Sequence, residues 1–262
     1  MNESVRFFRK SIIMWWVVLL LVSVAMANAR NTYQLAGVGM TFVNKVFGIG
    51  GDYLTQRDDG LRFGGSVGLS FSTDDQDFLG IRSSEFVIGF GGLFGYDFDP
   101  VWIDIGSNFG YGWITAQENS SWLFQNRPIV RNGDGLANGL QFAVVPRFGT
   151  HINTESVIIV PRFSIGFSWL WYSLTENANR SLSADLSQYV DIIDDTSVNA
   201  FGFSIGPGVS FIFEQFCISL GVNIPIRIKS EAEIVFIDGS KFSETANSDR
   251  NIGLNVGVGF RF

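Results

Sequence analysis

The sequence predicts an all-β protein, a transmembrane antiparallel up-and-down β-barrel of eight to ten strands preceded by an N-terminal signal peptide. Apolar residues alternate with small or polar ones along most of the chain, and past residue 29 no apolar run is long enough for a membrane-spanning helix. In lipid every backbone N–H and C=O needs an internal partner, so a closed barrel is the non-helical way to span a bilayer. A soluble β-sandwich is the alternative, but it would carry more surface charge than the 16% found here.

The first 29 residues have the pattern of a secretory signal peptide. A basic start that includes Arg6 and Arg9 precedes an apolar run from Ile12 to Ala27, and Ala27 and Ala29 form an A-x-A cleavage site. The alternative is an uncleaved anchor, because the apolar run is long for a signal. We expect cleavage, since no basic stop-transfer cluster follows the run. Residues 30–262 would then form one barrel domain.

The last strand carries the clearest alternation. Apolar residues occupy every second position from Ile252 to Phe262, and small or polar residues lie between them. This period of two is that of a strand with one face in an apolar medium. A terminal aromatic after such alternation resembles the signal read by the bacterial barrel-assembly machinery, so Phe260 and Phe262 are the predicted assembly signal.

The connections between strands alternate between short and long. The short turns are Asp97–Pro100, Thr150–Glu155 and Glu214–Gln215, and the long connections are about 73–84, 115–137, 173–196 and 237–249. Barrels of this class have short periplasmic turns and longer outer loops, which fixes the orientation. The predicted strands are 61–72, 85–97, 100–114, 138–149, 156–172, 197–213, 216–236 and 250–262. Outward aromatics gather at strand ends, as in the aromatic girdles of membrane barrels.

Residues 30–60 allow two interpretations. Their apolar residues alternate on either side of Asn44–Lys45, which would add one hairpin and make ten strands. Their glycines and the spacing of Leu35, Val38 and Phe42 also suit a helical segment folded inside an eight-stranded barrel as a plug. Both interpretations are kept at this point.

The inward positions are rich in glycine, which predicts a narrow barrel because tight curvature leaves little room inside. The charged candidates for the lumen are few and mostly basic. They are Arg62, Glu85, Asp104, Arg147, Arg162, Arg227, Lys229 and Arg261. Either these charges pair and close the lumen, or the surplus of arginine forms a constriction that favours anions.

Nothing in the sequence predicts an enzyme or a cofactor. The one histidine, His151, falls in a short periplasmic turn, which argues against a surface-facing His-dependent hydrolase or a His metal site, so no metal site is expected. The single cysteine, Cys217, is expected to be a small packed residue. A formal net charge of −7 makes nucleic acid an unexpected partner.

The alternating strands, girdles, signal peptide and terminal Phe262 together resemble the small bacterial outer-membrane barrels of the OmpW, OprG and OmpA-transmembrane type, including those of spirochaetes. The resemblance implies the outer membrane as location, with extracellular loops, lipid as surroundings and the assembly machinery as a partner during insertion. OmpW-like relatives imply passage of small molecules, and OmpA-like relatives imply adhesion. We expect a narrow porin-like channel for small solutes, because polar inward residues continue along most strands and the arginines outnumber the inward acids. The alternative is a non-conducting surface adhesin or structural protein whose loops bind host or envelope molecules.

Overall fold

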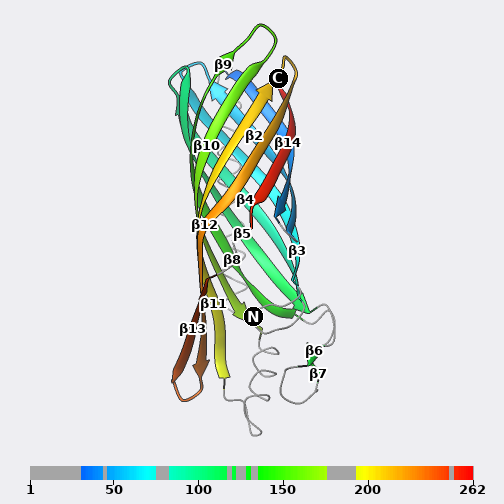
Figure 1. Ribbon diagram of the computed structural model, residues 1–262, viewed down its shortest axis with the longest axis vertical. Coiled ribbons are helices and arrows are strands. Elements are labelled where there is room, and N and C mark those ends of the chain that lie inside the picture. The colour runs from blue at the N-terminus through cyan, green and yellow to red at the C-terminus, as the bar shows by residue number, and fades with distance from the viewer. Residues whose placement is uncertain are drawn as a thin grey trace, which may run out of the picture.

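Ten antiparallel strands close into a ring in the computed structural model (Figure 1). The described residues are 31–43, 46–74, 83–116, 120–121, 128–130, 135–175, 193–247 and 251–261. The predicted signal peptide at 1–29, Phe262 and most of the predicted outer loops lie outside them. No helix within the described ranges is long and apolar enough to cross a membrane.

The ring is a meander in which each strand pairs with its neighbours in the chain. Its strands are β1 (Asn31–Val43), β2 (Val46–Arg57), β3 (Leu61–Asp74), β4 (Ser83–Asp97), β5 (Val101–Ala116), β8 (Gly135–Thr150), β10 (Ile158–Leu174), β11 (Ile193–Ile212), β12 (Phe216–Phe236) and β14 (Gly253–Arg261). Pairing of β1 with β14 closes it. Outside the ring, β9 (Ile152–Asn153) adds to β10, β13 (Lys241–Asn247) adds to β12, and β6 (Ser120–Ser121) pairs with β7 (Pro128–Val130).

The first hairpin belongs to the wall, which corrects the plug interpretation of residues 30–60. Strand β1 pairs with β14 from Leu35↔Arg261 to Val43↔Gly253, while β2 pairs with β3 along most of its length. Both edges of the β1–β2 hairpin are therefore hydrogen-bonded into the sheet, which a free internal plug would not be. The barrel has ten strands and not eight, and the eight other predicted strands are confirmed.

The two ends of the ring differ in the lengths of their connections. Residues 58–60, 98–100, 151–157 and 213–215 join strands at the end where β14 finishes, and the long connections lie at the other end. The turn before β3 needs glycine, because Gly60 has φ +89° and a Cβ there would lie 2.4 Å from the carbonyl oxygen of Asp97. The short-turn end is the periplasmic end in barrels of this class.

The predicted loop 237–249 contains a strand instead. Strand β13 pairs with β12 from Val235↔Lys241 to Lys229↔Asn247, so that the hairpin projects beyond the ring at the lower left of Figure 1. Its turn is held by Asp238, whose carboxylate accepts hydrogen bonds from the Ser240 backbone N–H (2.8 Å) and hydroxyl (2.6 Å). Strand β12 continues past its pairing with β14 in order to pair with β13, so it is much longer than β14.

The outward face is a band of exposed apolar side chains. Phe94 is 65% exposed and Ile105 is 55% exposed, and both point away from the interior. Aromatic pairs mark the two rims: Phe213 stacks on Phe216 at the short-turn end (centroids 4.3 Å apart), and Phe86 lies on Trp113 towards the other end (5.8 Å). These pairs confirm the predicted girdles. Such a surface is unfavourable in water and favourable against hydrocarbon.

Candidate functional site: the barrel interior

A cavity of about 890 Å³ runs along the interior of the ring. Glycines of β1, β2, β3, β4 and β14 form one side of it, among them Gly39, Gly50 and Gly68. It is lined from Thr41 and Val46, beside the outer turn of the first hairpin, down to residues at the short-turn end. The prediction was that inward glycines fit the tight curvature of a narrow barrel, and these glycines do line the interior.

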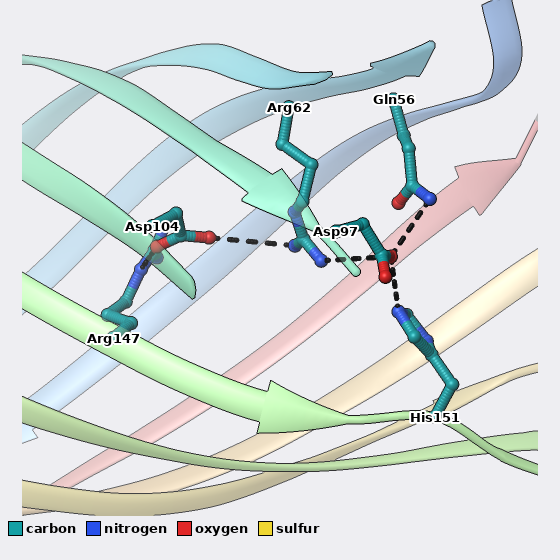
Figure 2. Close-up of polar contacts among 6 residues, drawn as sticks. All are labelled: Gln56, Arg62, Asp97, Asp104, Arg147 and His151. Atoms are coloured by element: carbon teal, nitrogen blue, oxygen red, sulfur yellow. Dashed lines mark hydrogen bonds and ion pairs between the residues drawn. The ribbon is translucent and has the colours of Figure 1, made fainter. Parts of the chain in front are cut away.

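A cluster of charged side chains crosses the interior at the short-turn end (Figure 2). Arg62 of β3 lies between two carboxylates, with Nη2 3.6 Å from Asp104 Oδ2 and Nη1 3.9 Å from Asp97 Oδ2. Arg147 of β8 donates from Nε to Asp104 Oδ1 at 2.6 Å. Four consecutive strands of the ring, β3, β4, β5 and β8, thus supply two cations and two anions that neutralise each other.

Asp97 is the second centre of this cluster. Its Oδ2 accepts a hydrogen bond from Gln56 Nε2 (2.9 Å) and lies 2.8 Å from His151 Nε2. The side chain of Asp97 is 4% exposed and that of Asp104 is fully buried. Buried carboxylates are stable only when paired, and here each has at least two polar neighbours. We call Gln56, Arg62, Asp97, Asp104, Arg147 and His151 the periplasmic charge cluster.

An apolar group fills the interior beside the charge cluster. Trp102, Val160, Ile212 and Cys217 are buried together at the short-turn end, with Leu35 and Ile158 packed against them. The guanidinium of Arg62 lies over the Trp102 ring, 4.1 Å from its centroid. Side chains, rather than backbone of the first hairpin, therefore occupy this end of the lumen. Cys217 is a packed residue, as predicted.

Glu85 lies towards the other end of the interior and is held by three side chains. Tyr172 donates its hydroxyl to Glu85 Oε1, Gln141 Nε2 donates to the same oxygen at 3.0 Å, and Ser72 donates to Oε2 at 3.3 Å. These contacts place Glu85 inside the barrel, as the alternation predicts. Its partners are neutral, so it keeps a net negative charge in the outer half of the lumen when ionised.

Arg162 is the lumen cation that has no carboxylate within ion-pair distance in the described parts of the chain. Its side chain lies against Gly208, where a Cβ would be 3.0 Å from Arg162 Nε, and it lines the cavity. Asp52 lines the same cavity from β2.

Arg227 and Lys229 do not line the lumen, which corrects the prediction. The ladder between β11 and β12 pairs Phe203 with Arg227 and Ser204 with Pro225, which leaves Ile226 unpaired in a β-bulge. The extra residue shifts the alternation, so that Ile228 lines the cavity while Arg227 and Lys229 share the outward side with Phe203 and Phe201.

Arg261 lies at the short-turn end, as predicted. It pairs with Leu35, which packs on the internal apolar group, and its backbone N–H donates to the carbonyl of Gln215. Of the two residues of the predicted assembly signal, the structure describes Phe260, which is 62% exposed on the outward face.

Several interior residues were not predicted from the sequence. Asp97 and Trp102 have the inward parity of their strands and could have been found by extending the alternation to the strand ends. His151 was assigned to an ordinary turn, although it follows the inward positions 147 and 149. Asp52 and Gln56 depend on the first hairpin being part of the wall, which the sequence left open.

The backbone groups of the strands pair within a closed ring, and an apolar band between two aromatic rims surrounds it. These two features together are those of a membrane-spanning barrel. The chain is an outer-membrane β-barrel. No family model matches its sequence, and no curated protein matches it. The barrel is therefore placed by its architecture.

Solved structures of bacterial outer-membrane proteins resemble the barrel at low sequence identity. A major outer membrane protein from Thermus thermophilus is 12% identical, with 88% of this chain and 100% of that one covered and a TM-score of 0.40. OprG from Pseudomonas aeruginosa is 13% identical (89% and 98% covered, TM-score 0.44), and the attachment invasion locus protein Ail of Yersinia pestis is 11% identical (89% and 99%, 0.32). None of these supports a spirochaetal origin.

Proposed function

We propose that this barrel is a narrow channel for small solutes, closed at its periplasmic end by side chains. The observation that carries the proposal is the 890 Å³ cavity, which extends from the outer turn of the first hairpin to the periplasmic charge cluster. Side chains change rotamer far more readily than strands of a closed sheet rearrange, so this closure is of a kind that can open. The periplasmic charge cluster and Trp102 would form the constriction.

Single-channel recording tests this proposal. The full barrel is refolded in detergent, its β-structure is confirmed by circular dichroism, and currents are recorded in a planar bilayer. We expect brief, small steps for the unaltered protein and larger, longer ones for the double variant Arg62→Ala/Trp102→Ala, which shortens two side chains of the constriction. Glu85→Gln is the control, because Glu85 lies in the outer half. The proposal is overturned if the unaltered protein and the double variant both fold but neither gives current steps.

A second candidate function is surface binding, favoured by the projecting β12–β13 hairpin. Ile237 is 64% exposed and Phe242 is 53% exposed on this hairpin, beyond the ring. Exposed apolar side chains outside the lipid band are typical of contact surfaces. The comparison is adhesion of whole cells to host matrix by the unaltered protein and by Ile237→Ser/Phe242→Ser. Unchanged adhesion would remove this support.

We also propose that the protein is not an enzyme. The side chains that contact Asp97, the partner of His151, are Gln56 and Arg62, and neither is a nucleophile. A His–Asp pair acts on a substrate through a nucleophile or an activated water, and this one lies within a buried charge cluster.

A further inference from the structure

We propose that Arg227 and Lys229 form a binding site for the phosphate group of a lipid in the outer leaflet, on the outside of the barrel. The site is separate from the lumen, so the inference does not depend on whether the protein conducts. It rests on the bulge in β12, on the level of the two residues along the strand, and on their surroundings.

The bulge is what turns these two cations outward. Without the extra residue at Ile226, the alternation from Cys217 and Ser219, which line the cavity, would put Arg227 and Lys229 inside as well. With it, the two residues are paired to outward aromatics and are exposed. Bulges commonly re-aim side chains in this way. The next inward position is filled by Ile228.

Their level along β12 places them at the outer edge of the lipid band. The strand starts at Phe216, which belongs to the aromatic rim of the short-turn end. A tilted transmembrane strand crosses the hydrocarbon in about 9–11 residues, and Arg227 and Lys229 lie just at the far end of such a span. A charge facing lipid is costly at the midplane and nearly free at the interface, where phosphate groups lie.

The two cations have a positive charge that their described neighbours do not fully neutralise. In the described ranges no carboxylate lies within ion-pair distance of Arg227 or Lys229. Glu233, further out on the strand, is already paired with Lys241 at 2.9 Å. Among the described residues, Glu231 is the one acid close by on the same face, and counted with it the two cations keep a surplus of one positive charge. Two cations two residues apart can share one phosphate, because its oxygens accept several charge-assisted hydrogen bonds.

The apolar surface beside the cations matches the rest of a lipid molecule. Phe203 and Phe201 are their direct neighbours on β11, Phe201 is 59% exposed, and Phe203 packs against Phe167 with centroids 5.3 Å apart. Acyl chains would lie along this aromatic surface while the headgroup meets the cations. This continuity with the lipid-facing band is why we assign a lipid and not a soluble phosphate ester.

Binding of lipid A to the full refolded barrel in mixed detergent micelles tests the proposal. The titration uses fluorescently labelled lipid A with both phosphates and the same lipid after phosphatase treatment. We expect the apparent Kd to rise about fivefold for Arg227→Gln or Lys229→Gln and about 25-fold for the double variant, the usual contribution of basic residues at an anionic surface. Dephosphorylated lipid should bind the unaltered protein as weakly as lipid A binds the double variant.

Two variants on the same face serve as controls. Glu231→Gln should tighten binding, because it removes the nearby negative charge, whereas Lys241→Gln should change it little, because Lys241 lies further out along the hairpin, opposite Val235. All these side chains are exposed, and a gel shift on heating shows whether each variant is folded. The proposal is overturned if the double variant binds lipid A like the unaltered protein, if removal of the phosphates changes nothing, or if millimolar-range inorganic phosphate displaces the lipid completely.

Discussion

Asp104 is the residue on which the interior of this barrel depends most. Its carboxylate is fully buried and contacts two guanidinium groups, those of Arg62 and Arg147. Removing one partner of a buried ion pair leaves the other charge without compensation, at a cost of about 3–5 kcal/mol. We expect Asp104→Ala to lower the free energy of unfolding by about that amount, as measured by urea titration in detergent with Trp fluorescence.

The control for the Asp104 substitution is a substitution in a solvent-exposed ion pair. Arg57 and Asp59 are 3.1 Å apart, but their side chains are 40% and 55% exposed. Asp59→Ala is expected to change the free energy of unfolding by less than about 1 kcal/mol. Equal effects of the two substitutions would contradict the view that the periplasmic charge cluster is desolvated.

Arg162 is the lumen residue whose charge bears most directly on ion preference. It lines the cavity without a carboxylate within ion-pair distance in the parts of the chain that the structure describes. If the barrel conducts, Arg162→Ala should shift the reversal potential in a salt gradient towards cations. We expect an effect of about fivefold in permeability ratio, since a unit charge a few Å away in water contributes about 1 kcal/mol.

The matched control is Arg227→Ala, which removes the same side chain from the outside. Because Arg227 faces outward, it should leave ion preference unchanged. A shift of the same size for both variants would place Arg227 in the conduction path and contradict the bulge.

The difference between these two arginines shows how far the sequence can predict the site. Alternation placed Arg62, Glu85, Asp104, Arg147 and Arg162 correctly inside, because one face of each strand meets lipid and the other cannot. It failed after Pro225, where Ile224, Ile226 and Ile228 continue a regular apolar pattern across the bulge. The one available signal was Pro225 itself, since proline inside a strand is confined to edges and bulges.

Among the elements that were not predicted, β13 is the longest in the described parts of the chain. Its segment Lys241–Asn247 is mostly polar, with Phe242 as its one large apolar residue, so it lacks the alternation that predicts a strand with one apolar face. The first hairpin was left undecided because glycine-rich alternation suits a wall strand and a plug equally. In the structure, β1 is hydrogen-bonded to β14 and β2 to β3, so the first hairpin is part of the barrel wall.

The turn of the β12–β13 hairpin is stabilised by hydrogen bonds to an ionisable side chain, that of Asp238. Hydrogen bonds from the Ser240 hydroxyl and backbone N–H hold the pKa of Asp238 below its ordinary value. A lowered pKa means that the turn is stabilised above the ordinary pKa of an aspartate, and that the stabilisation is lost as the pH falls through the lowered value. We expect Ser240→Ala to move the pKa of Asp238 back towards its ordinary value, as followed by carboxyl-carbon NMR.

The control for this turn is Asp238→Asn, which keeps an acceptor but does not titrate. The amide resonances of residues 239 and 240 should then be insensitive to acid pH, in contrast to the unaltered protein. Amide shifts that titrate equally in both would assign the effect to another carboxylate.

At the scale of the whole molecule, closure of the ring is the property that the first hairpin supplies. Strand β1 is the element that joins β14 to β2, so deletion of residues 31–60 would leave β14 and β3 as unpaired edges. Unpaired backbone groups in lipid cost several kcal/mol each, and eight strands would have to close with a different stagger. We expect this deletion variant to lose the gel shift on heating and the β-rich circular dichroism of a folded barrel.

The matched control shortens the β12–β13 hairpin at its turn. Replacing residues 235–241 by Asn-Gly joins the paired residues Ile234 and Phe242 through a two-residue turn that suits a hairpin. Because the ring loses only the two outermost pairs of the β11–β12 ladder, Ile193↔Phe236 and Asp195↔Val235, this variant should fold and insert like the unaltered protein. If the variant without residues 31–60 also folded, the remaining strands would be able to close on their own, and the first hairpin would be an addition to an eight-stranded barrel.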